Sequence, residues 1–202
     1  MRKIRNKEGA MSLWMVIVLL VAVVVFTGLV EIMQRSFALQ EINSVMDTAG
    51  VTALSKNVKE EEIEKWERYY RTGNYKPDIN DLVSKEGTKH LYKKIVEDDT
   101  AHITFIRDTD DAKLTVSSYE DTHGLGTSTL PRPQVEIDSV MIVTVDAHGL
   151  FDKIANLNKW YYESRSSENF MISYIGENED GEVELSIRSV TRIIYNREFS
   201  EG

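Results

Sequence analysis

Carboxylates gather in two short stretches of the chain where a divalent cation could be bound. The stretches are "RDTDDAK" and "GENEDGEVE", and their acidic residues are Asp108, Asp110, Asp111, Glu177, Glu179, Asp180 and Glu182. Carboxylate oxygens are the ligands that calcium prefers, but the first stretch lacks the glycine and the closing glutamate of an EF-hand loop. The second coincides with a hairpin turn that Asp180-Gly181 would supply in any case. We therefore predict no metal site.

Other residues that could carry chemistry are scattered. The histidines show no H-E-x-x-H or related ligand spacing, and they are His90, His102, His123 and His148. There is no cysteine, which excludes Cys-ligated zinc and thiol catalysis. No G-x-S-x-G, G-x-x-x-x-G-K-[ST] or G-x-G-x-x-G motif is present, and the glycines of "HGLG" are expected in a loop. We predict that the protein is not an enzyme and has no catalytic residue and no cofactor.

The most informative stretch is apolar. Leu13 to Val30 contains no charged residue, and 13 of its 18 residues are Leu, Ile, Val or Phe. As a helix it would span roughly 27 Å, close to the hydrocarbon thickness of a bilayer. Four cations precede it, at Arg2, Lys3, Arg5 and Lys7. We predict a basic cytoplasmic leader over residues 1–9 and a transmembrane helix over residues 10–30, with the rest of the chain outside the cell membrane.

A secretory signal peptide is the alternative interpretation of the same stretch. Such peptides have a shorter apolar region that is followed directly by a small-x-small cleavage site. Here the nearest pattern of that kind, Ser36-Phe37-Ala38, lies beyond both Glu31 and Arg35. The sequence therefore favours a single-pass membrane anchor over a cleaved signal peptide.

The remainder of the chain is acidic. The net charge is −9, and residues 1–9 carry +3, which leaves −12 for residues 10–202. Phosphate binding needs clustered Lys and Arg, so we predict no nucleic-acid partner.

The helical pattern continues past the membrane. No proline occurs before Pro77, and we predict one helix from Ser12 to Asn57, with residues 31–58 as an extracytoplasmic stalk. Apolar residues follow a/d spacing along this stalk, at Ile32, Leu39, Ile42, Met46, Ala49 and Ala53. This seam can pack on the chain's own globular domain or on neighbouring helices in an assembly, and small residues such as Ala49 would permit close approach.

Residues 59–202 are predicted to form an α+β head. Residues 59–71 favour a charged surface helix with one aromatic face, at Trp66, Tyr69 and Tyr70. Asp78 can cap a second helix that reaches Glu97, and a short helix is expected over residues 150–162. Alternating residues predict strands of a mostly antiparallel sheet in five segments, 101–107, 112–120, 134–147, 169–176 and 182–196.

Taken together, the N-terminal features resemble the type IV pilin superfamily, and most closely the TadE/TadG-like minor pseudopilins of tight-adherence (Flp-type) pili. The resemblance covers residues 1–58. It is carried by Lys7, Gly9-Ala10, the apolar run, Glu31 with Arg35, and the small-residue helix "EINSVMDTAGVTALSKNV".

The resemblance implies a processing site between Gly9 and Ala10 and a prepilin peptidase as a partner if the leader is removed. Pilins of this superfamily carry Glu at the fifth mature position, where this chain has Trp14, and the residue before Gly9 is Glu8. The pattern therefore favours a minor or membrane-retained subunit over a major pilin, with the Ile32–Ala53 seam as its assembly surface.

Three functions follow as expectations. The first is a minor pilin-like structural component of a bacterial surface pilus or secretion apparatus, with the lipid bilayer and other pilin-like or secretion-apparatus subunits as partners. The second is an unprocessed bitopic subunit of a conjugation or type IV secretion channel. The third, a membrane-anchored ligand sensor, is disfavoured because the basic N-terminus is too short to carry an output domain.

Overall fold

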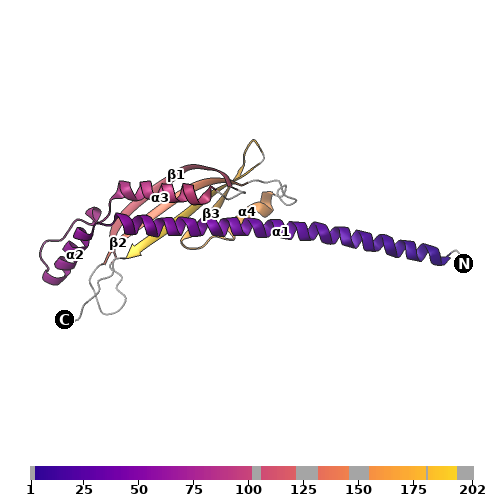
Figure 1. Ribbon diagram of the computed structural model, residues 1–202, viewed down its shortest axis with the longest axis horizontal. Coiled ribbons are helices and arrows are strands. Elements are labelled where there is room, and N and C mark those ends of the chain that lie inside the picture. The colour runs from indigo at the N-terminus through magenta and orange to yellow at the C-terminus, as the bar shows by residue number, and fades with distance from the viewer. Residues whose placement is uncertain (1–2, 102–105, 122–131, 146–154, 181, 195–202) are drawn as a thin grey trace.

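A computed structural model describes residues 3–101, 106–121, 132–145, 155–180 and 182–194; for residues 3–10, 106–112, 121, 132, 155–158 and 194 it describes the backbone alone. The chain forms a long helix whose first half projects beyond a compact head (Figure 1). The elements in order are α1 (Lys3–Asn57), α2 (Glu60–Thr72), η1 (Ile79–Asp81), α3 (Lys85–Thr100), β1 (Ile106–Asp121), β2 (Arg132–Val145), α4 (Ala155–Glu163), β3 (Phe170–Glu177) and β4 (Val183–Ile194).

Helix α1 is continuous over 55 residues, or about 80 Å. Its predicted end at Asn57 is confirmed, and its beginning at Lys3 extends the predicted helix into the leader. The helix ends where the chain starts to pair with a distant segment. Val58 forms a bridge with Val83, and the Ser84 N–H donates to the Asn57 carbonyl over 3.1 Å. These contacts hold the end of α1 close to the beginning of α3.

The described strands form one antiparallel sheet in the order β1-β2-β4-β3. The α+β fold with a long N-terminal helix is therefore confirmed. Strands β2 and β4 occupy the centre, in a register that pairs Gln134 with Ile194 and Val145 with Val183. Helices α1 and α3 lie side by side over one face of this sheet, α1 against β4 and α3 against β1 (Figure 1).

The core lies between the two helices and that face of the sheet. Every second residue of β4 from Val183 to Ile187 is buried there, as the alternation predicted. Each large aliphatic side chain that is buried contributes about 1.5–3 kcal/mol. The largest buried side chains of this layer are Ile42, Met46, Leu54, Tyr92, Ile137, Val143, Leu185 and Ile187. The opposite face carries ion pairs, with Arg188 on Asp138 and Arg192 on Glu136.

Helix α2 confirms the predicted charged surface helix with an aromatic face. Trp66 is buried and meets the Tyr69 ring edge-on at a centroid distance of 5.9 Å. Lys65 binds Glu62 over 2.6 Å. Glu62 lies one turn back at i−3, so the two side chains are neighbours on the helix surface.

Two element boundaries were predicted wrongly. Asp78 caps a short 3-10 turn instead of α3, because its carboxylate accepts from the Asn80 N–H over 2.9 Å. Val83 then pairs with Val58, and α3 begins only at Lys85. The two strands predicted over residues 101–107 and 112–120 are one strand, β1, with shifts of register near Asp110.

Two further expectations fall partly or wholly outside the described residues. The described part of helix α4 is Ala155–Glu163, and residues 150–154 of the predicted helix lie outside the described residues. The loop predicted at "HGLG", residues 123–126, lies outside the described residues.

A buried hydrogen-bond chain joins α3 to the centre of the sheet. The Ser139 hydroxyl donates to the Ser189 carbonyl over 3.2 Å, so the Tyr92 hydroxyl is the donor in its 2.6 Å bond to Ser139. Burial raises the pKa of Tyr92 to about 12, and the bond to Ser139 only partly opposes this. Tyr92 therefore stays protonated and keeps its bond well into alkaline solution.

The raised pKa of Tyr92 predicts a loss of stability above pH 10. Between about pH 10 and 12 the unfolded chain releases the Tyr92 proton and the folded chain retains it. In this range the unfolded chain binds fewer protons than the folded chain. The free energy of unfolding therefore falls as the pH rises, by up to about 2–3 kcal/mol. Below pH 10 this contribution is complete.

Denaturant unfolding of the full chain in detergent, repeated across this pH range, measures the loss. Tyr92→Phe should flatten the pH dependence, with Tyr75→Phe as the matched control at an exposed tyrosine. An equally steep pH dependence in Tyr92→Phe would refute the assignment.

Candidate assembly surface along helix α1

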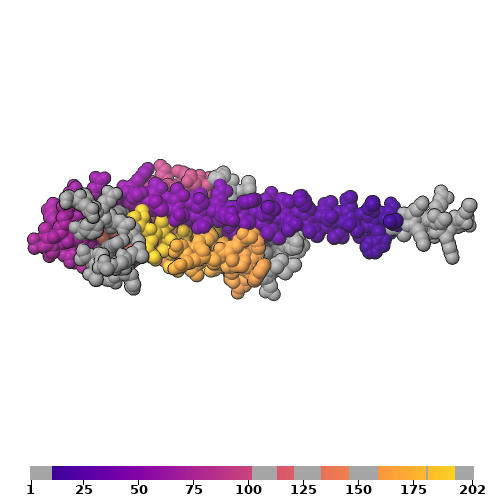
Figure 2. All heavy atoms as spheres, turned by 90° about the horizontal axis from the view of Figure 1, so that it is seen from below, coloured from indigo at the N-terminus to yellow at the C-terminus, as the bar shows by residue number. Residues whose placement is uncertain are grey.

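Helix α1 has two halves with opposite surroundings. From Met11 to Val30 all its large apolar side chains are exposed, and only 6% of its most apolar 18-residue window is buried (Figure 2). A buried core helix of a soluble domain would show the reverse. An apolar surface of this size is far larger than soluble monomers expose. By length and composition α1 can cross a membrane near the N-terminus of the chain.

The predicted processing site lies ahead of this half. The backbone of Gly9 and Ala10 is helical and continuous with the apolar span, and their side-chain surroundings lie outside the described residues.

The second half of α1 is packed on the head. Of the predicted seam, Ile32 is half-buried, and the other five side chains are buried in the core of the chain's own domain: Leu39, Ile42, Met46, Ala49 and Ala53. Of the two alternatives for this seam, the structure shows packing on the chain's own domain. These five side chains are covered, so a neighbouring helix must contact a different face of α1.

That different face is a row of exposed residues on the outer side of the stalk. They recur at alternating spacings of four and three, and they are Phe37, Glu41, Ser44, Thr48, Val51 and Ser55. We call this row the outer stripe. Residues at these spacings lie on one side of a helix, and three of the six are small (Ser44, Thr48 and Ser55), so another helix could approach closely there. In the sequence, this row is the complement of the a/d pattern. The prediction of an assembly surface rested on the a/d positions and did not include it.

Where α1 leaves the apolar span, charged and aromatic side chains surround it. Arg35 binds Glu31 over 2.6 Å, and the Arg35 side chain is buried. The Tyr161 hydroxyl of α4 donates to the Ile32 carbonyl over 3.0 Å, and Arg165 donates to the Ser36 hydroxyl. The Arg165 guanidinium also stacks on the Tyr161 ring, 4.5 Å from its centroid. Helix α4 is therefore fixed to the first turns of the stalk.

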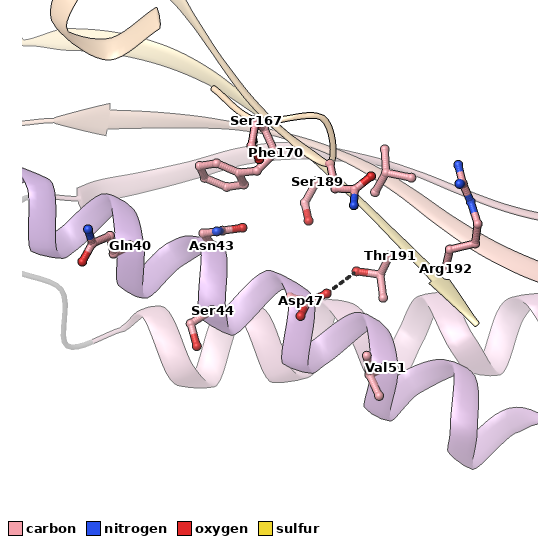
Figure 3. Close-up of a pocket in the computed structure, with 12 residues that line it drawn as sticks. Gln40, Asn43, Ser44, Asp47, Val51, Ser167, Phe170, Ser189, Thr191 and Arg192 are labelled. Carbon is pink, nitrogen blue, oxygen red and sulfur yellow. Dashed lines mark hydrogen bonds between the residues drawn. The ribbon is translucent and has the colours of Figure 1, made fainter. Parts of the chain in front are cut away.

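A polar groove of about 400 Å³ follows α1 on the side of β3 and β4 (Figure 3). One wall is the α1 side chains from Gln40 to Val51, and the other comprises Ser167, Asn169, Phe170 and the end of β4. Asp47 accepts a 3.3 Å hydrogen bond from Thr191, which ties the two walls together (Figure 3). Amides and hydroxyls dominate this lining, which suits hydrogen bonding to a partner surface.

The groups considered for metal binding are not assembled into a site in the described part of the chain. No cluster of three or more His, Asp or Glu that could hold a metal ion occurs among the described residues. His90 is exposed on α3, whereas His102, His123 and His148 lie outside them. In the second acidic stretch, the Asn178 side chain accepts from the backbone N–H of Asp180 and of Glu182, as in a turn. Gly181 itself is not described.

A small residue next to the seam, Gly50, permits close approach, and the approaching element is β4. A Cβ added to Gly50 would lie 2.5 Å from the Thr191 Cβ, far inside van der Waals contact. Gly50→Ala is therefore expected to lower the free energy of unfolding by about 1–2 kcal/mol, because overpacking outweighs the gain of about 1 kcal/mol in helix propensity.

Chemical unfolding of the purified full chain measures this difference. Thr48→Ala is the matched control, since it also raises helix propensity but lies on the exposed outer stripe. Equal stability changes in the two variants would contradict the close contact.

Comparison of the chain with protein-family models, with curated proteins and with solved structures finds no match. The functional argument therefore rests on the geometry of α1: its exposed apolar half, its buried face, the outer stripe and the polar groove beside it.

Proposed function

We propose that the chain is a membrane-anchored, non-enzymatic structural subunit, a minor pilin-like (pseudopilin) component of a bacterial surface pilus or secretion apparatus. The observation that carries the proposal is that one unbroken helix has two halves with different surroundings. Its first half is apolar and exposed to its surroundings, and its second half forms a layer of the head. A subunit with this shape can be stored in a membrane and joined to others through parallel helices.

In this mechanism the apolar half holds the subunit in the bilayer. Its 13 Leu, Ile, Val and Phe residues contribute about −4 to −8 kcal/mol to insertion, and no charge opposes them. The four cations before the span favour a cytoplasmic N-terminus, which puts the head on the outer side. The buried seam then gives the head a fixed attachment to its anchor.

Neighbouring subunits would pack on the outer stripe and fill the polar groove. The small residues Ser44 and Thr48 allow close approach of a second helix, and the groove offers amide and hydroxyl groups next to it. The absence of a carboxylate between Gly9 and Glu31 supports a minor role. A major pilin uses such a group to pair with its neighbour within the apolar layer, where a charge without a partner is costly.

The second candidate is an unprocessed bitopic subunit of a conjugation or type IV secretion channel. It is favoured by two residues at the possible processing site, Trp14 at the fifth position after Gly9 and Glu8 before it. In that case α1 is a permanent anchor, and the head docks on other channel proteins without entering a filament.

The assembly role predicts that the outer stripe has a neighbour in the native membrane. The chain has no cysteine, so Thr48→Cys introduces a single thiol on that face. A short bismaleimide applied to membranes should join it to a second copy or to another pilin-like or secretion-apparatus subunit, identified by mass spectrometry.

Glu64→Cys, exposed on α2 away from the stripe, is the matched control and should give no adduct. Equal adducts at both positions, or none at either, would argue against assembly through α1.

Processing separates the two candidate functions. A pilin-like subunit is expected to be recovered from its membrane with Ala10 as the first residue, and Gly9→Leu should retain the leader. Intact mass and N-terminal sequencing measure this directly. If the chain without this substitution still carries residues 1–9, the channel subunit is favoured. Cleavage near Ala38 would exclude both functions, because α1 would then lose its apolar span.

A further inference from the structure

Helix α4 lies at the level where α1 would leave the bilayer. The last residue of the apolar run is Val30. Tyr161 of α4 is hydrogen-bonded to α1 at Ile32, and Arg165, two residues after the end of α4, at Ser36. At 1.5 Å per residue these contacts are about 3–9 Å beyond the end of the run. The headgroup region of a bilayer is about 5–8 Å thick on each side of the hydrocarbon core. The contacts therefore put α4 at headgroup depth, at the end of the head nearest the exposed half of α1 (Figures 1 and 2).

The surface of α4 has the side chains that suit this depth. Trp160 is 66% exposed, whereas Trp66 in the head is 1% exposed. The adjacent Lys159 is also exposed, and on α1 the nearby Met33 and Phe37 expose more than half of their surface. Tryptophan concentrates at membrane–water interfaces, where its ring is partly in the apolar layer and its N–H stays hydrated.

Contacts with the head and with α1 hold α4 in the orientation that exposes Trp160. Tyr162, two residues after Trp160, is buried and anchors the helix to the head. Burial raises the pKa of Tyr161, although Arg165 partly opposes this, and Tyr161 therefore remains a neutral donor to the Ile32 carbonyl. A rotation of α4 that hid Trp160 would break these contacts.

We propose that α4 is an interfacial docking helix that inserts Trp160 into the outer headgroup layer of the same bilayer that α1 spans. The proposal rests on the membrane placement given under the proposed function and extends it to a second point of contact. With two attachments, at the span and at α4, the head holds one orientation above the membrane.

Apolar insertion, rather than charge, drives this contact. Lys159 and Arg165 are cationic, but the β3–β4 turn at the same end of the sheet carries four carboxylates, at Glu177, Glu179, Asp180 and Glu182 (Figure 1). These groups oppose attraction to anionic lipid. Docking is therefore expected in vesicles of phosphatidylcholine alone, and admixture of phosphatidylglycerol should not be required.

Tryptophan quenching by brominated phosphatidylcholine tests the proposal on the full chain reconstituted in vesicles. The protein has three tryptophans, and replacing two at a time with Phe leaves Trp14, Trp66 or Trp160 as the single reporter. Trp160 should be quenched most strongly by bromine near the headgroup. Trp14 lies at the start of the apolar half and should also be quenched, because the proposed span places it in the bilayer. Trp66 should not be quenched.

The reporters distinguish the two levels of failure. If Trp14 is not quenched, the membrane placement itself fails. If Trp14 is quenched and Trp160 is not, the span is inserted but α4 does not dock, and the present proposal is overturned. Trp160 fluorescence that changes only as protein density rises, without quenching, would also overturn it, in favour of contact with a second copy.

A second measurement avoids replacing the buried Trp66. Lys159→Cys keeps all three tryptophans and accepts a nitroxide label as the only thiol in the chain. In vesicles this label should gain collisions with oxygen relative to a water-soluble nickel complex, whereas a label at Arg68→Cys on α2 should not. Equal accessibility at the two positions would contradict interfacial docking.

Discussion

One constraint governs the molecule: a single helix supplies both the apolar span and a layer of the core. Ile42, Met46 and Leu54 of α1 are as deeply buried as the central residues of β2 and β4. The stalk half of α1 covers part of the apolar face of the sheet, so the head cannot be separated from that half of the helix without losing core. In a chain without cysteine, no disulfide could compensate. The apolar half contributes nothing to this core, but it is joined to the folded domain by an unbroken helix rather than by a linker.

The two layers are held in register by a few specific contacts. Gly50 brings α1 within reach of Thr191, and the Tyr92–Ser139–Ser189 chain connects α3 through β2 to β4. Buried hydroxyl bonds of this kind add specificity, since sliding the layers would leave polar groups unsatisfied. By contrast, the exposed ion pairs on the far face, such as Arg188 with Asp138, contribute little to stability.

The helices and strands with strong local signals were predicted well from the sequence. The bounds of helix α2 and the end of α1 were predicted to within a residue or two. The buried alternation of β4 and the turn between β3 and β4 were also predicted correctly. The errors lie where tertiary contacts override local pattern: Val58 pairs with Val83 and delays α3, and pairing with β2 joins two short segments into β1. For the candidate site, a/d spacing identified the buried face of the stalk but not its partner, because a sheet and a neighbouring helix demand the same apolar row. The contact of Tyr161 with Ile32 joins residues 129 positions apart, and no local pattern encodes it.

If α1 spans a bilayer as proposed, its unbroken passage from span to stalk couples the tilt of the span to the position of the head. Membrane helices tilt by about 20° on average, and the stalk from Val30 to Asn57 is about 40 Å long. A tilt of that size displaces the far end of the head sideways by about 14 Å. A thinner bilayer increases the tilt of a long span, and a thicker one brings it upright. Because α1 is unbroken between Lys3 and Asn57, the thickness of the bilayer would then act on the position of the head through the span, and the proposed attachment at α4 would oppose that displacement.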